Sequence, residues 1–374
     1  MSIRSSSAAG IALLALSLAP AVAQQRSSVK VNLSADSPVS LLSADWDDSR
    51  SQERGSAVLI QLNTALSLKN TSGRRIRAIT WMVQSREATP GGRASVTKAS
   101  LDVGPNETFP LRVELRLLRP VAPGGGPAVE MSLDGVLFDD LSFYGPNHLD
   151  SRRMMTAFEM EARRDRRYLL EVLQAKGPSG LQNEMLEAMA RQAETPRIDV
   201  QLAHNGRATA AAASGRDVQF AFLRFPDAPV EPMAGMARVV GSEARGPRME
   251  VVNRSRQAVR YLEIGWLVKD GRGREFLAGS VPARADLAPG AKTEILEQNS
   301  LRFADAKGAP LVIGAMTGYV SQVEFADGSV WVPSRSAIHD TGISSAEEQR
   351  LVNLYRRKGL KPLMDEIRRL APPR

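Results

Sequence analysis

The chain contains no cysteine. Disulfides, thiolate zinc sites, thiol nucleophiles and an acylated lipid anchor are therefore all excluded. Stability must come from apolar cores, and a chain of 374 residues that is 43% hydrophobic is long enough to build two ordinary domains.

Histidine is scarce too, and familiar catalytic motifs are missing. The three histidines are His148, His204 and His339, and two of them have a neighbouring carboxylate, Asp150 and Asp340. No HExxH, GxSxG, P-loop or GxGxxG motif occurs. The sequence thus predicts no catalytic, cofactor-binding or metal-ligating residue. A shared zinc, or a Ser-His-Asp site built on one histidine, is the alternative.

Asp45-Trp46-Asp47-Asp48 contains closely spaced carboxylates. They could hold Ca²⁺, but the segment lacks the glycine and the distal glutamate of a known calcium loop. A solvated acidic loop is the favoured interpretation. An active site made only of carboxylates elsewhere in the chain is a further alternative to a non-catalytic protein.

The first residues have the three-part pattern of a secretory signal peptide. Arg4 precedes an apolar stretch over residues 8–19, and Ala21-Val22-Ala23 supplies small residues for cleavage. The stretch is too short for a membrane-spanning helix, which needs about 20 apolar residues. We expect cleavage after Ala23, a periplasmic or extracellular protein, and no transmembrane anchor after cleavage.

The net charge of +8 could attract anionic partners. Acidic residues are interspersed, however, and export argues against nucleic acid as a partner. The densest basic stretch is 163–167, where helical spacing could place Arg152, Arg163 and Arg167 on one face toward an anionic surface. Ion pairing with nearby acids such as Glu159 explains the pattern equally well.

The two halves of the chain repeat each other. Asn70 in Asn-x-Ser matches Asn253, and the strand pattern that follows carries Trp81 in one half and Trp266 in the other. A nearly constant offset separates the matching positions. Because both tryptophans lie inside apolar strands, we expect them to pack in cores and not to bind ligand.

Within each half, apolar residues recur at every second position, as in 111–117, and Asp-Gly or Pro-Gly pairs mark turns, as at Asp134-Gly135 and Asp270-Gly271. This pattern predicts a mainly β protein with helices, built from two antiparallel β-sandwiches, each followed by a helical segment. Asp150 is expected to cap the first helix, which breaks near Gly177, and Ser345 with Glu348 forms a capping box.

The second half resembles the FxLyD and CARDB type of immunoglobulin-like domain in exported bacterial proteins. The resemblance is carried by Asn253-Arg254-Ser255, the segment 266–271 and Leu287-Ala288-Pro289-Gly290. The first half departs from it, since 85–92 replaces the tight Asp-Gly hairpin and Asn106 stands where glycine would be. The resemblance implies a fold and at most an interaction role, with no catalytic residues.

The expected domain order follows from these elements: a signal peptide at 1–23, a first immunoglobulin-like sandwich at 27–148, a helical segment at 149–195, a connector at 196–216, a second sandwich at 217–340 and C-terminal helices at 344–370. Residues 198–202 and 218–222 are equally good counterparts of the first strand. Whether 197–216 belongs to the second sandwich is left open.

The sequence favours an exported, non-catalytic protein of the bacterial cell envelope that binds or assembles with another envelope protein or polymer. One alternative is an envelope enzyme with a site assembled between the two domains. Another is an adhesin that holds an anionic envelope polymer through the Arg-rich helix.

Overall fold

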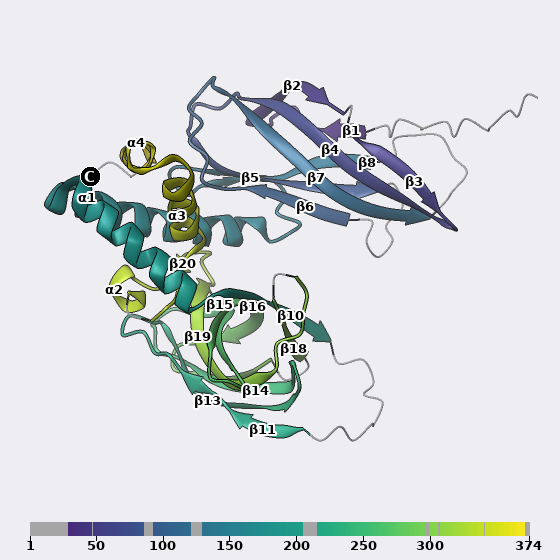
Figure 1. The fold of residues 1–374 in the computed structure, drawn as a ribbon. Helices are drawn as coiled ribbons and strands as arrows, with labels where there is room; N and C mark the ends of the chain where they lie inside the picture. The colour runs from purple at the N-terminus through teal and green to yellow at the C-terminus, as the bar shows by residue number, and fades with distance from the viewer. Residues whose placement is uncertain are drawn as a thin grey trace, which may run out of the picture.

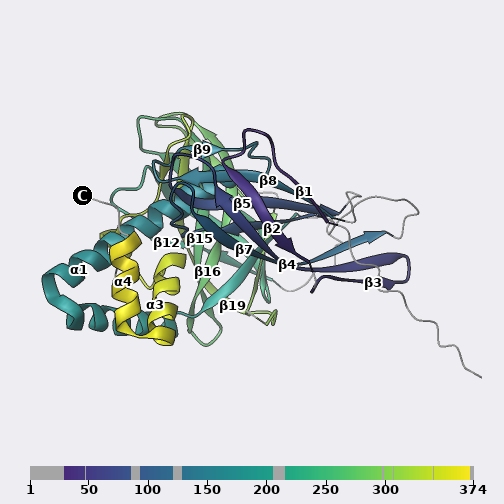
Figure 2. The same cartoon turned by 90° about the horizontal axis from the view of Figure 1, so that it is seen from above.

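The computed structural model describes residues 29–46, 48–85, 93–120, 129–204, 215–296, 299–305, 307–339 and 341–370. These form an N-terminal β unit (residues 29–144), a long helix, a C-terminal β unit (residues 197–331) and three further helices. Figures 1 and 2 show the two β units stacked, with the helices gathered at one end of both. The fold is mainly β with helices, as predicted. In the described part, no helix is both long enough and apolar enough to cross a membrane.

The N-terminal unit has two sheets. One has the order β1-β8-β5-β6 with β9 paired to β8, and in the other β2, β3 and β7 pair with β4. The strands are β1 (Val29–Asn32), β2 (Val39–Asp45), β3 (Arg50–Arg54), β4 (Ala57–Asn70), β5 (Ile76–Ser85), β6 (Arg93–Lys98), β7 (Thr108–Pro120), β8 (Val129–Phe138) and β9 (Phe143–Tyr144). Both sheets contribute to one apolar core, which includes Leu66 and Leu111 from one sheet and Trp81 and Val136 from the other.

The C-terminal unit is one 11-stranded sheet. Nine of its strands follow the order β11-β13-β14-β18-β10-β16-β15-β19-β12, and the other two are β17, which pairs with β14, and β20, which pairs with β19. The strands are β10 (Arg197–His204), β11 (Arg216–Gln219), β12 (Ala221–Phe222), β13 (Val230–Val240), β14 (Glu243–Asn253), β15 (Val259–Asp270), β16 (Glu275–Leu287), β17 (Lys292–Ile295), β18 (Asn299–Ala304), β19 (Ile313–Phe325) and β20 (Val330–Trp331). Strand β10 joins the two halves, parallel to β16 and antiparallel to β18.

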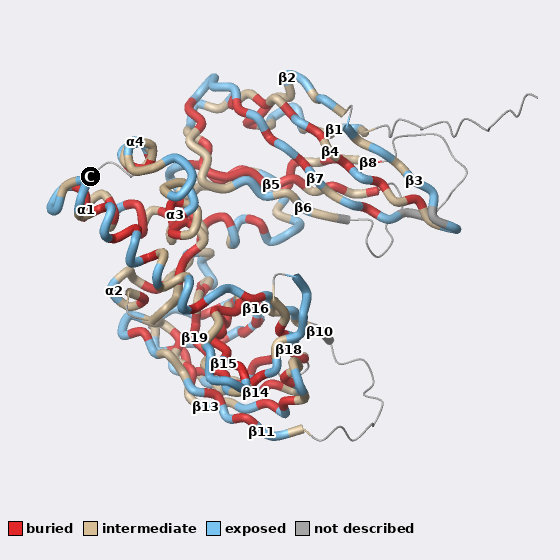
Figure 3. Tube along the Cα trace, viewed as in Figure 1, coloured by how far each residue is buried: buried red, intermediate tan, exposed pale blue. Residues whose placement is uncertain are grey.

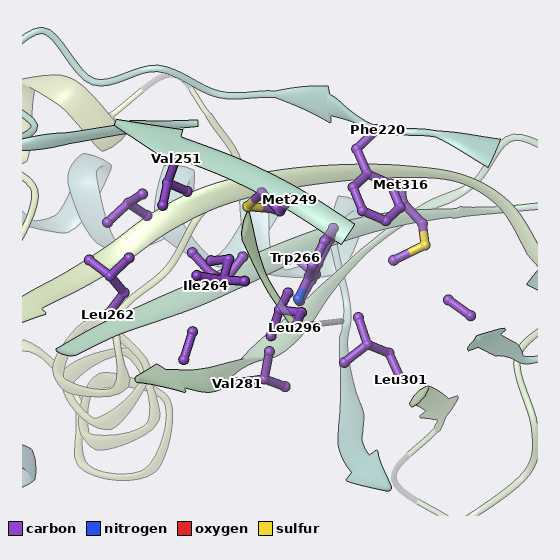
Figure 4. Packing of buried hydrophobic residues seen from close by; sticks show 14 of the residues in the cluster. Phe220, Met249, Val251, Leu262, Ile264, Trp266, Val281, Leu296, Leu301 and Met316 are labelled. Atoms are coloured by element: carbon purple, nitrogen blue, oxygen red, sulfur yellow. The ribbon is translucent and has the colours of Figure 1, made fainter. Parts of the chain in front are cut away.

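Both ends of this long sheet face the same core. Figure 4 shows Trp266 among Met249, Ile264 and Val281, which come from β14, β15 and β16. Trp81 and Trp266 are both fully buried, so the prediction that they are core residues is confirmed. In Figure 3 the buried residues follow the strands of both units and the inner side of the long helix.

The repeat seen in the sequence is also present in the strand pairing. Strand β1 runs parallel to β8, and β12 runs parallel to β19 in the same way. Strand β8 is also the antiparallel neighbour of β5, which carries Trp81, and β19 is the antiparallel neighbour of β15, which carries Trp266. The counterpart of β1 is therefore in 218–222. Residues 197–204, within the stretch expected as a connector, form β10, and 205–214 lie outside the described residues.

The helices are α1 (Ser151–Glu194), α2 (Arg335–Ile338), α3 (Ala346–Lys358) and α4 (Leu360–Leu370). The break predicted near Gly177 is present inside α1, where Gly177 has a φ of 70° and Pro178 follows. Gly359, with a φ of 82°, ends α3, because glycine adopts this conformation without steric cost.

The capping predictions were partly wrong. Asp150 adopts a left-handed conformation and its side chain caps nothing, whereas Asn147 Oδ1 accepts a hydrogen bond from the amide of Arg152. Ser345 does cap α3 by accepting from the amide of Glu348. The carboxylate of Glu348 accepts a hydrogen bond from Arg335, so it contacts a residue of α2.

The turn predicted at Asp134-Gly135 was also wrong. Both residues lie inside β8, at a register shift where the pairing moves from Thr80 to Trp81. Asp134 is buried, and its carboxylate accepts hydrogen bonds from the His148 amide and the Ser151 hydroxyl. A β-bulge re-aims a side chain, and here it ties the strand to the start of α1.

Candidate functional site

A buried ionic network holds α1 to α3 and to the N-terminal unit. The guanidinium of Arg166, fully buried, donates to Glu347 at 2.6 Å and to the Ser100 hydroxyl at 3.0 Å. Burial alone would raise the pKa of Glu347, but Arg350 and Arg166 lower it to about 2. Each of these charges has an opposite charge within reach, so the network's role is structural.

The three arginines expected to face an anionic surface are not on one free face. Arg163 is half-buried, pairs with Glu159 at 2.8 Å and donates to the carbonyl of Asp139. Arg152 and Arg167 are exposed. Arg152 lines a polar hollow of about 300 Å³, and other arginines as well as several carboxylates line the same hollow. Contact of these arginines with an anionic surface stays a prediction.

The histidines do not form a site among the described residues. His148 is an exposed loop residue, and the ring of His339 lies edge-on to Tyr168 at 6.2 Å between centroids. The side chain of His204 lies outside the described residues, as do Asp340 and Asp47. Within the described ranges, no three histidine, aspartate or glutamate side chains come together as metal ligands.

A cavity lies between α1 and the C-terminal unit. It has a volume of about 380 Å³, within the range of small-molecule sites. One stripe of α1 forms a wall, because Met154, Ala157, Phe158, Glu161 and Arg164 recur at helical spacing. The remaining walls come from β15, β16 and β19, the first residue of β10, and the segment from Pro333 to the start of α3. They include Arg197, Glu263, Ser280, Tyr319, Ser321, Gln322, Ile338, Ile343 and Ser344.

Glu161 stands out on the helical wall. Burial raises the pKa of its carboxyl to about 7, although Arg164 and Arg197 act in the opposite direction. No hydrogen bond or ion pair joins this carboxylate to another side chain in the part of the chain that the structure describes. A half-buried carboxyl with a perturbed pKa in a hollow is a candidate for binding or for proton transfer.

Gln322 is the second unusual group. It is only 5% exposed, it lines the same cavity, and its amide nitrogen Nε2 has no hydrogen-bond partner among the described residues. A buried amide without a partner costs roughly 1–3 kcal/mol. Such a group is explained if its partner arrives with a ligand.

The internal repeat supplies a matched comparison for this wall. Ala78 in β5 pairs with Leu137 in β8, and this buried apolar pair packs against Met155 of α1. In the C-terminal unit Glu263, which like Ala78 stands three residues before the repeated tryptophan, pairs with Gln322. The same helix therefore meets an apolar pair on one unit and a polar pair on the other, and only the second is next to the cavity.

The remaining charges in the cavity wall are largely engaged. Glu263 accepts from Arg153 at 2.8 Å and from the Ser280 hydroxyl at 2.5 Å. Arg164 donates to Asp165 at 2.9 Å and to the carbonyl of Pro333 at 2.6 Å. Among the described residues the Arg197 side chain makes one hydrogen bond, at 3.2 Å to the carbonyl of Ser344, and so keeps donors for another partner.

No protein-family model matches the sequence, and no curated protein matches it. Among solved structures, pT26-6p is 9% identical, with a TM-score of 0.16 over 88% of this chain and 73% of its own. A selenomethionine-labelled β-glucosidase from Kluyveromyces marxianus is 10% identical, with a TM-score of 0.13 over 71% and 45%. TM-scores this low carry no argument, so function has to be argued from the cavity itself.

The sequence analysis missed Glu161, Gln322 and Glu263. A signal for Glu263 was present in the repeat, because Glu263 and Ala78 each stand three residues before the repeated tryptophan. A charged residue in one copy and alanine in the other marks a difference in what the two strands face.

Proposed function

We propose that the protein is an exported, non-catalytic binding protein of the bacterial cell envelope that takes a small ligand or a chain end into the cavity beside α1. The observation that carries the proposal is the buried and unpartnered amide of Gln322 in the cavity wall. Where α1 packs on the N-terminal unit, the residue paired with Ala78 is Leu137, which is buried without this penalty. Polar groups that weaken a fold are expected where they serve binding.

The proposal includes two immunoglobulin-like sandwiches. The repeated pairing of β1 with β8 and of β12 with β19, together with a buried tryptophan in each unit, supports this family of folds. Such folds carry many functions, so the envelope role rests on the signal-peptide pattern and the binding role on the cavity.

The test replaces Gln322 with an apolar residue of similar size. Gln322→Leu removes the unpartnered amide at nearly constant volume, so the variant should unfold at the same temperature as the wild type or higher. A thermal-shift screen of polar small molecules should then yield compounds that stabilise the wild type and not Gln322→Leu. Gln182→Leu, on the exposed side of α1, is the control and should respond like the wild type.

Two outcomes would contradict the proposal. One is a set of compounds that stabilise the wild type and Gln322→Leu equally. The other is a Gln322→Leu variant that is several kcal/mol less stable than the wild type, since that would mean the amide supports the fold.

A second function is favoured by Glu161, because a carboxyl with a pKa of about 7 suits general acid–base catalysis at neutral pH. The cavity would then belong to an envelope enzyme. Glu161→Gln separates the two functions. A binding protein should return its ligand unchanged after prolonged incubation, whereas an enzyme should convert it and lose at least a hundredfold in rate with Glu161→Gln.

A further inference from the structure

We propose that the ligand of this cavity presents a primary ammonium group next to a carbonyl oxygen, as the amino terminus of a peptide does. The inference rests on the proposed function and narrows it to a chemical class. It follows from which polar groups in the wall lack a partner.

The unpartnered groups have opposite requirements. The carboxylate of Glu161 can only accept hydrogen bonds when it is ionised, so it needs a donor on the ligand. The Nε2 of Gln322 can only donate, so it needs an acceptor. In a peptide amino terminus the ammonium nitrogen, a donor, is three bonds away from the carbonyl oxygen, an acceptor. One ligand end can thus satisfy both groups.

The charge balance favours an ammonium over a neutral donor. Glu161 faces the charged or titratable groups Arg164 and Asp165 of α1, Arg197 of β10, Glu263 of β15 and Tyr319 of β19. Arg164 is bound to Asp165 and Glu263 to Arg153, which leaves Glu161 and Arg197 as the less engaged pair. A cation beside Glu161 would restore its ionised form, and an acceptor oxygen could reach the spare donors of Arg197.

The size and the apolar wall limit how much of a peptide can enter. About 380 Å³ corresponds to roughly a dozen water molecules at about 30 Å³ each. This is room for one or two residues. Phe158 and Met154 of α1 and Ile338 and Ile343 on the opposite side supply an apolar surface for the first side chain.

The test uses isothermal titration calorimetry with defined probes at pH 7, where a peptide α-amino group, with a pKa of about 7.7–8.0, is still mostly protonated. L-Phe-L-Ala-amide carries both groups, its N-acetyl form lacks the ammonium, and 2-phenylethylamine lacks the carbonyl. We expect the first probe to bind at least tenfold more tightly than either of the others. Free L-phenylalanine distinguishes a free amino acid from a peptide end as the natural source of the same chemistry.

Two variants assign the contacts. Glu161→Gln should weaken the binding of L-Phe-L-Ala-amide at least tenfold and leave the binding of its N-acetyl form unchanged. Gln322→Leu should remove most of the advantage of L-Phe-L-Ala-amide over 2-phenylethylamine. Lowering the pH from 7 to 5 should weaken binding of the dipeptide amide to the wild type but not to Glu161→Gln, because protonation removes the carboxylate charge while the ligand stays an ammonium ion.

Equal or tighter binding of the N-acetyl probe would overturn the inference, as would the absence of heat from any probe at 10 mM. If the thermal-shift screen still finds a ligand without an amine, the binding function stands and only the ligand class is wrong. If neither experiment finds a ligand that depends on Gln322, both proposals fail.

Discussion

Asn70 and Asn253 make the same hydrogen bonds in the two β units. The Nδ2 of Asn70 donates to the carbonyls of Arg74, Val103 and Gly104. The Nδ2 of Asn253 donates to three carbonyls at the equivalent places, and each Oδ1 accepts from the serine two residues later. Both side chains are fully buried, so one amide closes a turn and joins it to a second loop.

We therefore expect Asn70→Ala and Asn253→Ala to lower the free energy of unfolding by roughly 2–3 kcal/mol each, since buried carbonyls lose their donor. Urea unfolding followed by tryptophan fluorescence measures the change. Asn183→Ala, on the exposed side of α1, is the control and should shift it by less than about 0.5 kcal/mol. A loss as small as the control's at either buried site would refute the structural role.

Acid should loosen the attachment of α3. The folded-state pKa of Glu347 is about 2, below its usual value of 4.5, because Arg350 and Arg166 outweigh the effect of burial. Ionised Glu347 thus stabilises the fold above pH 4.5, and this contribution is lost as the pH falls from 4.5 toward 2. Urea unfolding at pH 7, 4 and 3 should show the decline.

The matching variant is Glu347→Gln, which leaves the buried Arg166 with only the more distant carboxylate of Glu159, at 3.6 Å. At pH 7 it should cost roughly 3–5 kcal/mol, and below pH 4.5 its stability should fall less steeply than that of the wild type. Glu187→Gln on the exposed side of α1 should follow the wild-type pH profile. Parallel pH profiles for the wild type and Glu347→Gln would be incompatible with the assignment.

Glu161 should have the opposite pH dependence. Its folded-state pKa is raised to about 7 from 4.5, so the fold favours the protonated carboxyl and loses stability as the pH rises from 4.5 through 7. Glu161→Gln should therefore melt at a higher temperature than the wild type at pH 8 and at nearly the same temperature at pH 5. Glu171→Gln, exposed on α1, should show no such pH dependence.

Export remains a prediction from the sequence, since residues 1–28 lie outside the described part. We expect the mature protein to begin at Gln24, after cleavage behind Ala23. N-terminal sequencing of protein recovered from the periplasm or the medium checks this. A cytoplasmic protein that retains Met1 would contradict export and weaken the envelope role.

The features that the sequence predicted depend on local patterns. The alternating strands, the break at Gly177 and the capping of α3 by Ser345 are each encoded within a few residues. The repeated tryptophans were predictable because two copies of one pattern reinforce each other. Asp134-Gly135 was misassigned because a dipeptide common in turns also suits a bulge within a strand.

The cavity and the ionic network could not be predicted in the same way. Glu161 acquires its raised pKa from the C-terminal unit packed across α1, and Arg166 meets Glu347 only after the chain has returned to the first unit. Such contacts join residues far apart in sequence, which periodicity does not report. The difference between Ala78 and Glu263 was visible, but its meaning depends on which side of the strand meets the helix.

The position of Arg166 has a consequence for how the molecule is made. A chain that emerges N-terminus first presents the charged, inward side of α1 long before its partner, since Glu347 follows 181 residues later. Until then, the N-terminal unit can form its own core, but Arg166 has to stay hydrated and α1 cannot dock fully. Helix α4 adds a second late contact, from Arg369 to Asp102. The N-terminal unit is thus fastened to the rest of the molecule only after α3 and α4 have been synthesised.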